Sequence, residues 1–337
     1  MRVAYVCTDP GIPVFGSKGA SVHAQSVLRA LVARGAEVDL LTPRPGGLAP
    51  EDLRGVRVHE LPAVPKGMTA DRELAARDSD ATVADVLARL HGAGPLDVVY
   101  ERYSLWGRTS TAWAADAGVP SVLEVNAPLV DEQAAHRELA GRAAAERVAE
   151  AALSAATATV CVSDEVAVWA RIRSARPERV HVVPNGVDVG RITPSSRPVA
   201  TADAGPLTVG FVGTLKPWHG VELLLDALVL LEAEVPGAHR VLLVGDGPQA
   251  PLLRERAVGL GLSHLVELTG AVAPADVPAL LHRMDIAVAP YPALEPFYFS
   301  PLKVYEYLAA GLPVVASRIG QVGAVLDDGR LGVLVEP

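Results

Sequence analysis

The chain has 337 residues, half of them hydrophobic, which is enough for two ordinary domains with cores of their own. Its formal net charge of −9 and isoelectric point near 5.5 argue against a broad electrostatic footprint for nucleic acid or anionic lipid. Any site for a polyanion must therefore be small, and we expect a soluble protein that binds no nucleic acid.

The N-terminus and the cysteines indicate the compartment. The segment MRVAYVCTDP has one basic residue and too short an apolar run for a signal peptide, and no stretch approaches the length of a transmembrane helix. Cys7 and Cys161 each end an apolar run and lack a metal-like spacing to another ligand. We expect a cytoplasmic protein whose two cysteines are reduced and buried.

Strands and helices alternate along the whole chain. The β-branched runs of the first half are interrupted by helical patterns, which we place at residues 21–34, 68–91 and 129–154. The second half repeats the scheme, with a helix at 221–234. This alternation predicts two α/β domains, each a doubly wound parallel sheet covered on both faces. The predicted strands cover residues 2–7, 37–42, 56–61, 97–101, 120–125, 157–163, 179–184, 207–213, 239–245, 264–270, 285–291, 313–317 and 332–336.

The domain boundary is predicted from composition. The segment GRITPSSRPVATADAGP is rich in Pro, Ser, Thr, Ala and Gly and has no apolar period, which is typical of a linker. We therefore assign residues 1–190 to an N-terminal domain, 191–205 to a linker and 206–337 to a C-terminal domain. Ligands of open α/β sheets bind in the crevice at the carboxyl ends of the strands, so the loops there are the candidates for function.

The loop after the first strand, TDPGIPVFGSKGASVH, ends at a helix whose predicted N-cap is Ser21. Gly16 and Gly19 would allow the backbone to approach a ligand, and the free amides of the helix N-terminus would suit an anion or a sugar hydroxyl. From these residues alone, a flexible surface loop is an equally good interpretation.

The corresponding loop of the second half, FVGTLKPWHG, places Lys216 and His219 near the N-terminus of a helix. Cationic side chains beside free backbone donors are typical of a diphosphate site. The alternative is a solvated lysine with a structural histidine, but the position after a strand end favours function.

The segment VLLVGDGPQA formally matches G-x-G-x-x-A after a strand, through Gly245, Gly247 and Ala250. This match supports an alternative function, a nicotinamide-dependent oxidoreductase. We favour a tight strand-to-helix turn, because so short a match has low specificity. Substitution of Gly247 would discriminate, since the oxidoreductase needs that position, whereas a diphosphate site elsewhere would depend on Lys216 and Glu306.

The segment EPFYFSPLKVYEYLAAGLPVVAS combines a loop with a helix that we expect to begin at Ser300 as N-cap and to end before Gly311. The amides of residues 300–303 would then form an anion site. Glu306 would face the same crevice and accept two hydrogen bonds from a vicinal diol such as ribose. The alternative is an ion pair between Glu306 and Lys303 on a solvated face.

Taken together, FVGTLKPWHG, LLVGDGP and SPLKVYEYLAAGLPVVAS resemble the C-terminal domain of the family 4 retaining glycosyltransferases (glycosyl transferases group 1) of the GT-B fold. LEVNAPLVDE and VVPNGVD fit the same family, so the resemblance covers essentially the whole chain. It implies two Rossmann-like domains facing a central cleft. It also implies transfer of a sugar from a nucleoside-diphosphate donor with retention at the anomeric carbon and without a metal.

The resemblance also implies site residues. Lys216 lies in the diphosphate-binding segment, Glu306 matches the second carboxylate of the family's E-x7-E element, which holds the nucleotide ribose, and Gly19 matches the glycine-rich loop. Catalytic roles fall to Lys216, Glu306, Glu295 and Asn126. The implied donor-binding residues are Gly16, Gly19, Gly213, Thr214, His219, Gly245, Ser300, Pro301, Leu302 and Lys303.

The chain departs from the family pattern at three places. The first E-x7-E position is Tyr298, and the nearest upstream carboxylate, Glu295, comes three residues earlier. Thr214 and His219 stand where the family has an arginine and a lysine, and Asn126 stands where many members have a histidine near the donor sugar. These departures keep open a third hypothesis, a non-catalytic protein on the same fold.

No cofactor or metal is expected. No histidine pair has ligand spacing, and the D-x-D at residues 78–80 lies in a charged helical stretch with no strand before it. The partners are a nucleotide sugar and an acceptor that is a glycan, a lipid or a small molecule. Arginines 137, 142 and 147 could touch an anionic membrane surface, although a solvated helix face is favoured. Family members normally continue into helices beyond the last strand, and we expect the C-terminal domain to lack them.

Overall fold

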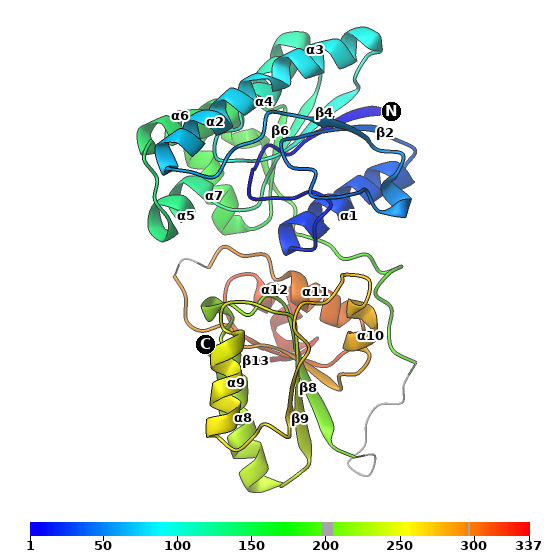
Figure 1. Ribbon diagram of the computed structural model, residues 1–337, viewed down its shortest axis with the longest axis vertical. Helices are drawn as coiled ribbons and strands as arrows, with labels where there is room; N and C mark the ends of the chain where they lie inside the picture. The colour runs from blue at the N-terminus through cyan, green and yellow to red at the C-terminus, as the bar shows by residue number, and fades with distance from the viewer. Residues whose placement is uncertain (197–204, 296) are drawn as a thin grey trace. The chain divides into compact units, whose positions relative to one another are not determined.

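The computed structural model describes residues 1–196, 205–295 and 297–337 (Figure 1). It divides into two compact units, Met1–Pro184 and Asn185–Pro337, each of which contains one open parallel sheet. Residues 197–204 of the predicted linker lie outside the described residues. Both sheets confirm the predicted α/β class.

The first unit is built on a seven-stranded parallel sheet of order β3-β2-β1-β4-β5-β6-β7. The order reverses direction between β1 and β4, so the crevice for a ligand lies at the carboxyl ends of these two strands. The strands are β1 (Arg2–Val6), β2 (Glu37–Thr42), β3 (Arg57–Glu60), β4 (Val98–Arg102), β5 (Ser121–Val125), β6 (Ala158–Cys161) and β7 (Val180–Val182).

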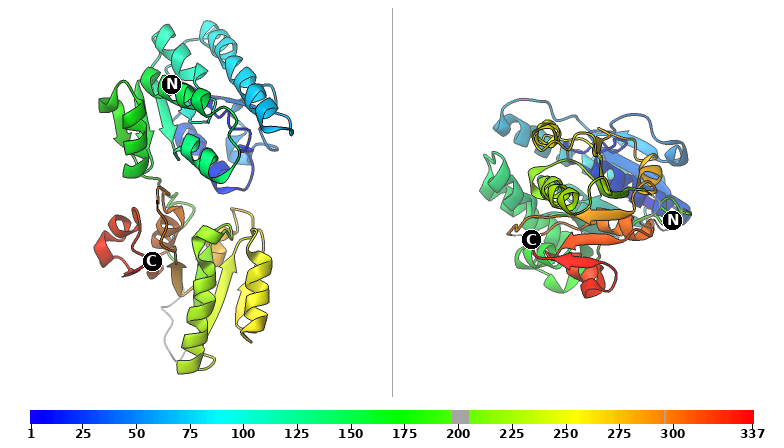
Figure 2. Two further views of the ribbon diagram at one scale, coloured as in Figure 1. Left: turned by 90° about the vertical axis from the view of Figure 1, so that its left-hand side faces the viewer. Right: turned by 90° about the horizontal axis from the view of Figure 1, so that it is seen from below.

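Helices cover both faces of this sheet, as the views in Figure 2 show. Along β1, Val3 and Tyr5 pack into the core beneath α1, whereas Ala4 and Val6 pack into the core beneath α3 and α4. Successive side chains of a strand point to opposite faces, so a continuous apolar run serves two cores. The helices are α1 (Gly19–Ala33), α2 (Thr69–Ala81), α3 (Val83–Ala93), α4 (Thr109–Ala117), α5 (Leu129–His136), α6 (Arg142–Ala155) and α7 (Asp164–Arg173).

Two helix predictions for the first unit are wrong. Helix α1 begins at Gly19, two residues before the predicted cap, and Ser21 is buried in its first turn. The helix expected over residues 129–154 is interrupted between α5 and α6. There the buried carboxylate of Glu73 accepts hydrogen bonds from the amides of Ala140 and Gly141 at 2.8 and 3.0 Å, so these amides are bonded to a side chain of α2.

The second unit contains a six-stranded parallel sheet of order β10-β9-β8-β11-β12-β13, whose switch point lies between β8 and β11. The helices α8 and α9 pack on one face, and α10, α11 and α12 contribute to the core on the other. The strands are β8 (Leu207–Val212), β9 (His239–Val244), β10 (Val266–Leu268), β11 (Ile286–Ala289), β12 (Val314–Ser317) and β13 (Val333–Val335). The helices are α8 (Val221–Glu234), α9 (Ala250–Gly259), α10 (Val277–Leu281), α11 (Leu302–Ala309) and α12 (Val322–Val325).

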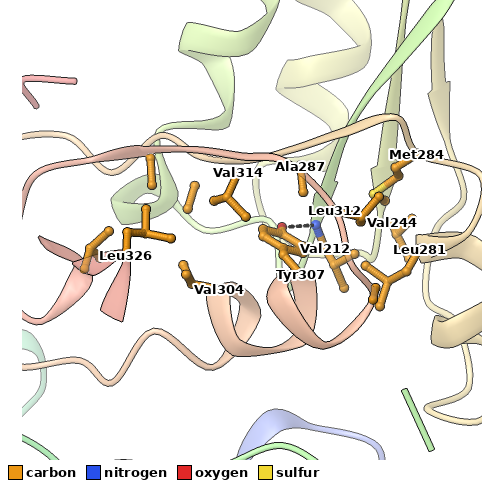
Figure 3. Close-up of a cluster of buried hydrophobic side chains, with 14 of the residues drawn as sticks. Val212, Val244, Leu281, Met284, Ala287, Val304, Tyr307, Leu312, Val314 and Leu326 are labelled. Atoms are coloured by element: carbon orange, nitrogen blue, oxygen red, sulfur yellow. Dashed lines mark hydrogen bonds between the residues drawn. The ribbon is translucent and has the colours of Figure 1, made fainter. Parts of the chain in front are cut away.

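At the switch point, a tyrosine from α11 joins the two diverging strands. β8 and β11 pair only near their starts, through Val209–Ile286 and Gly210–Ala287. Farther along, the hydroxyl of Tyr307 accepts a hydrogen bond from the Val212 amide at 2.9 Å and donates to the Val288 carbonyl at 3.3 Å. Figure 3 shows the first of these bonds inside the apolar cluster. The hydroxyl therefore satisfies two buried backbone groups that no longer pair with each other.

We expect the substitution Tyr307→Phe to destabilise the second unit by about 2 kcal/mol, because it leaves a buried amide and a buried carbonyl without partners. Equilibrium chemical denaturation measures the loss, and amide hydrogen exchange at Val212 localises it. The matched control is Tyr305→Phe, at a partly exposed tyrosine of the same helix, which should change stability by less than about 0.5 kcal/mol. Equal stability of the two variants would contradict the prediction.

Candidate functional site

The loop after β8 is held by backbone contacts to its neighbours. The amides of Gly213 and Leu215 donate to the carbonyls of Val244 and Asp246 at 3.0 and 2.9 Å, which ties the loop to the end of β9. Gly220 has a φ of 61°, and a Cβ there would lie 2.0 Å from the Pro290 carbonyl oxygen at the end of β11. Three neighbouring strand ends are therefore packed backbone to backbone.

The glycines of the GDG segment take part in the same packing. A Cβ on Gly245 would lie 2.1 Å from the Gly213 carbonyl oxygen, and one on Gly247 would lie 2.4 Å from that of Leu215. These glycines are required by the approach of another loop. The structure thus supports the interpretation as a tight turn and accounts for the G-x-G spacing without a dinucleotide.

The cationic candidates of the β8 loop differ in charge. Burial, aided by the positive charge of Lys303, lowers the pKa of His219 to about 3. The ring is therefore neutral near neutral pH, and its Nδ1–H donates to the Thr214 carbonyl at 2.6 Å. Thr214 itself is exposed. Lys216 is partly exposed, with its amine 5.3 Å from the centre of the Trp218 ring, so it remains the cation of this loop.

Helix α11 begins one residue later than predicted. Its N-cap is Pro301, not Ser300, and the Ser300 hydroxyl is buried without a hydrogen bond among the described residues. Pro301 has no amide hydrogen, and the Leu302 amide donates to the Ser300 carbonyl at 2.9 Å. The expected row of free amides is therefore reduced to at most those of Ser300 and Lys303.

The ion pair between Glu306 and Lys303, which was the alternative interpretation, is not formed. Glu306 instead pairs with Arg191 at 3.6 Å, and the Lys303 amine donates to the Tyr291 hydroxyl at 3.2 Å. Burial raises the pKa of the Glu306 carboxyl, while Arg191 and Lys303 act in the opposite direction. Arg191 was missed by sequence reasoning because it lies in the predicted linker, 115 positions from its partner, where nothing in the local pattern indicates a charge pair.

Two residues of the loop before α11, Glu295 and Tyr298, lie in different environments. Glu295 is exposed, whereas Tyr298, at the first E-x7-E position, is buried with its ring 4.4 Å from that of Phe299. In the second unit the structure thus gathers Gly213, Lys216, His219, Gly245 and Lys303 around the end of β8. Glu295 shares no described contact with that group.

In the first unit, Gly16 lies in the loop after β1 and Gly19 starts α1. A Cβ on Gly16 would lie 2.8 Å from the Pro13 ring, and the Gly16 carbonyl accepts a hydrogen bond from Gln25 at 2.8 Å. Gly19 is exposed with open space around it, so packing within this unit does not require a glycine there. The loop is therefore anchored at Gly16 and open at Gly19.

A charged cluster lies at the carboxyl ends of β4 and β5. Glu124 accepts a hydrogen bond from the His23 Nε2 and lies 3.7 Å from the Arg102 guanidinium. Burial raises the pKa of Glu124, but His23 and then Arg102 outweigh it and hold that pKa at about 2. Asn126 follows on the same strand end, and its Nδ2 is buried without a partner among the described residues. His23 was missed because α1 lies about 100 residues from β5, whereas a carboxylate at a buried strand end was a usable signal for Glu124.

A second buried carboxyl group, Glu101, lies beneath the floor of a cavity. It accepts a hydrogen bond from Ser110, and a Cβ on Gly107 would lie 2.5 Å from both its Oε1 and the Ser104 hydroxyl. Ser104 bonds Thr8 at 2.5 Å, and both line the cavity. Burial, with the charge of Asp80, raises the pKa of Glu101 to about 8.

The cavity itself has a volume of about 170 Å³ and lies at the switch point of the first sheet. Arg72 and Arg137 line it, together with Glu73, whose carboxylate is bonded to backbone amides. The three arginines considered for a membrane surface therefore do not share one helix face: Arg137 lines the cavity, and Arg142 bonds Asp131 at 3.1 Å. Within the described ranges, no helix is both long and apolar enough to cross a membrane.

Metal-ligating side chains are scattered. Among residues 1–196, 205–295 and 297–337, no three His, Cys, Asp or Glu side chains are placed to hold one ion. Cys7 and Cys161 are free thiols buried in the core, and burial raises the pKa of each to about 12. Their predicted place in the core is confirmed.

Comparison with known proteins agrees with this geometry. The family described as Glycosyltransferase Family 4 matches residues 17–191, and the one described as Glycosyl transferases group 1 matches residues 206–337. A D-inositol 3-phosphate glycosyltransferase of Geodermatophilus obscurus is 31% identical, over 94% of this chain and 74% of that protein. The fold is therefore that of a GT-B glycosyltransferase. The chain belongs to glycosyltransferase family 4.

Solved structures show the same fold at low identity. Sucrose-phosphate synthase from Thermosynechococcus elongatus superposes with a TM-score of 0.71 at 19% identity, covering all of this chain and 86% of the other. Anabaena HepE, in complex with UDP-glucose, gives 0.67 at 20% identity, with the same coverage of both chains. The predicted family is confirmed, and the oxidoreductase and non-catalytic alternatives lose their support.

We expect Glu101→Gln to stabilise the protein at alkaline pH. The folded carboxyl keeps its proton up to a pKa of about 8, above its ordinary value of 4.5, so the wild type loses up to about 1.4 kcal/mol for each pH unit between these values. The amide of the variant has no proton to lose. Thermal unfolding at pH 5 and pH 8 should show a smaller pH-dependent loss in the variant than in the wild type.

The control for this measurement is Glu60→Gln, at an exposed carboxylate of β3, which should keep the wild-type pH dependence. Parallel stability curves for the wild type and Glu101→Gln would show that the buried carboxyl ionises at an ordinary pH.

Proposed function

We propose that this family 4 enzyme transfers a sugar from a nucleoside-diphosphate sugar to a small polar acceptor, with retention at the anomeric carbon and without a metal ion. The main support for this function is the arrangement of residues at the switch point of the second unit. There a partly exposed lysine, glycine backbone and a carboxylate paired with an arginine lie around the ends of β8 and β11. The UDP-glucose complex of HepE, which has the same fold, supports a donor of this class.

The roles follow from chemistry. Glu306, whose carboxylate is partnered by Arg191, would accept hydrogen bonds from the two ribose hydroxyls. Lys216 and the N-terminus of α11 would stabilise the leaving diphosphate in place of a metal ion. An oxygen of that diphosphate would take the acceptor's proton on the face where the new bond forms, which gives retention without a protein nucleophile.

The cavity of the first unit is the proposed acceptor site. Its volume of about 170 Å³ is below the range of roughly 300–1,000 Å³ usual for drug-sized ligands, so one small ring fits it better than a lipid or a long glycan. Asp9 and Glu132 also line the cavity and could accept hydrogen bonds from hydroxyl groups, whereas Arg72 and Arg137 would bind a phosphate group of the acceptor. The relative from G. obscurus is named for D-inositol 3-phosphate, and we propose a phosphorylated polyol of this kind here.

For the donor, we expect thermal stabilisation by one of UDP, GDP and ADP, equally with and without EDTA. Glu306→Gln should weaken binding of that nucleotide about tenfold or more in titration calorimetry, because it removes charged hydrogen bonds to the ribose. Glu255→Gln, at an exposed position of α9, is the control and should bind like the wild type. Binding that needs a divalent metal, or that survives in Glu306→Gln, would contradict the proposal.

For the acceptor, we expect D-inositol 3-phosphate to bind at least about tenfold more tightly than myo-inositol in the presence of the nucleotide, since each arginine can make a charge-assisted bond to phosphate. The double variant Arg72→Ala/Arg137→Ala should abolish this preference, while Arg89→Ala on the exposed face of α3 should keep it. Transfer to the phosphorylated polyol, followed by NMR of the product, reads the anomeric configuration directly, and inversion would refute the proposed stereochemistry.

A further inference from the structure

Lys303 is a buried amine without a counterion. It is the second residue of α11 and only 8% exposed. Its amine lies 4.6 Å from the centre of the Phe211 ring and 4.8 Å from that of Tyr291, and it donates a hydrogen bond to the Tyr291 hydroxyl at 3.2 Å. No carboxylate of the described residues forms an ion pair with it, since Glu306, one turn away, pairs with Arg191. A cation in such surroundings is costly unless it is paired.

The amine lies beside the loop proposed to bind the diphosphate. A Cβ on Gly213 would lie 3.4 Å from the Lys303 Cε, so the side chain runs directly against the start of that loop. Gly213 has a φ of 148°, a conformation that other residues rarely adopt. The side chain of the helix and the backbone of the loop therefore share one small region at the end of β8.

Thr214 and His219 stand at the two positions where the resemblance implies an arginine and a lysine, and neither provides a positive charge here. Thr214 is uncharged, and His219 is held neutral while its Nδ1–H donates to the Thr214 carbonyl. Lys303 is close enough to His219 that its charge contributes to this effect. Of the described side chains at the strand end, the two that can offer a positive charge are thus Lys216 from the loop and Lys303 from the helix.

We propose that Lys303 is a counterion of the donor diphosphate, reaching from α11 into the place left by Thr214 and His219, and that donor binding is coupled to uptake of a proton by its amine. This proposal rests on the proposed function. In the free protein, burial favours the neutral amine. The arriving phosphates supply the missing negative charge, and a proton from solvent completes an ammonium–phosphate pair that can also stabilise the leaving diphosphate.

The groups around the amine agree with this coupling. Burial lowers the pKa of Lys303 to about 7, against the attraction of the Glu306 carboxylate. Tyr291 stays a neutral phenol, because burial raises its pKa, and His219 carries no charge above a pH of about 3. Of Lys303, Tyr291 and His219, Lys303 is therefore the one whose charge changes between pH 6 and pH 8.

The test is titration calorimetry with UDP-glucose, GDP-glucose and ADP-glucose, because the diester phosphates of a sugar nucleotide do not titrate near neutral pH. Runs in buffers of different ionisation enthalpy count the protons exchanged. We expect close to one proton taken up per site at pH 8 and about one tenth at pH 6, with affinity falling up to about tenfold per pH unit above 7. The wild-type measurement needs no variant to be folded.

Two variants show which lysine takes up the proton when the sugar nucleotide binds. Lys303→Met should bind more weakly at pH 6 and take up no proton at either pH. Lys216→Met should also bind more weakly but keep the proton uptake of the wild type, because Lys303, the group proposed to take up the proton, is unchanged in it. Binding of a sugar nucleotide without proton uptake, or uptake that persists in Lys303→Met, overturns this inference and leaves the proposed function standing. Failure of all three nucleotides to bind overturns both.

Discussion

The second unit depends on one hydroxyl group. β8 and β11 are paired for only two residues, and the sheet opens beyond them because the strands lead to opposite sides at the switch point. The Tyr307 hydroxyl occupies the opening and bonds Val212 on one strand and Val288 on the other. Opening the sheet would otherwise leave these two groups buried and unsatisfied. The two strands can therefore separate without leaving these backbone groups unpaired. The same two hydrogen bonds attach α11 to the sheet at this point.

The loops around this point are positioned by backbone rather than by side chains. Gly245, Gly247 and Gly220 allow main chains to touch where any Cβ would collide, which draws the ends of β8, β9 and β11 together. The same contacts explain why G-x-G after β9 resembles a dinucleotide fingerprint although the order of strands places the switch point elsewhere.

The sequence predicts the strands and helices of this protein well, but it does not predict which distant side chains pair with each other. Apolar runs of four to seven residues identify parallel strands that serve two cores, and the loops at their carboxyl ends follow from that architecture. Helix starts differ by one or two residues at Gly19 and Leu302, because neither helix begins at a side-chain cap of the kind on which the prediction relied. The pairs Arg191–Glu306 and His23–Glu124 join segments about 100 residues apart, and no local period indicates them.

In both units, a neighbouring helix brings an ionisable side chain to a strand end where the resemblance implies one from the loop itself. At the β5 end, Asn126 stands where the resemblance implies a histidine, and His23 on α1 reaches the adjacent Glu124. At the β8 end, Thr214 and His219 supply no cation, and Lys303 on α11 lies against the same loop. Comparing motifs position by position would count both sites as degraded. The physical requirement, however, is a charge at a point in space, and a helix packed beside the loop can meet it as well as the loop itself. A buried amine with no carboxylate partner is more easily accommodated in its neutral form, and a ligand that carries negative charge can supply the counterion that its protonated form lacks.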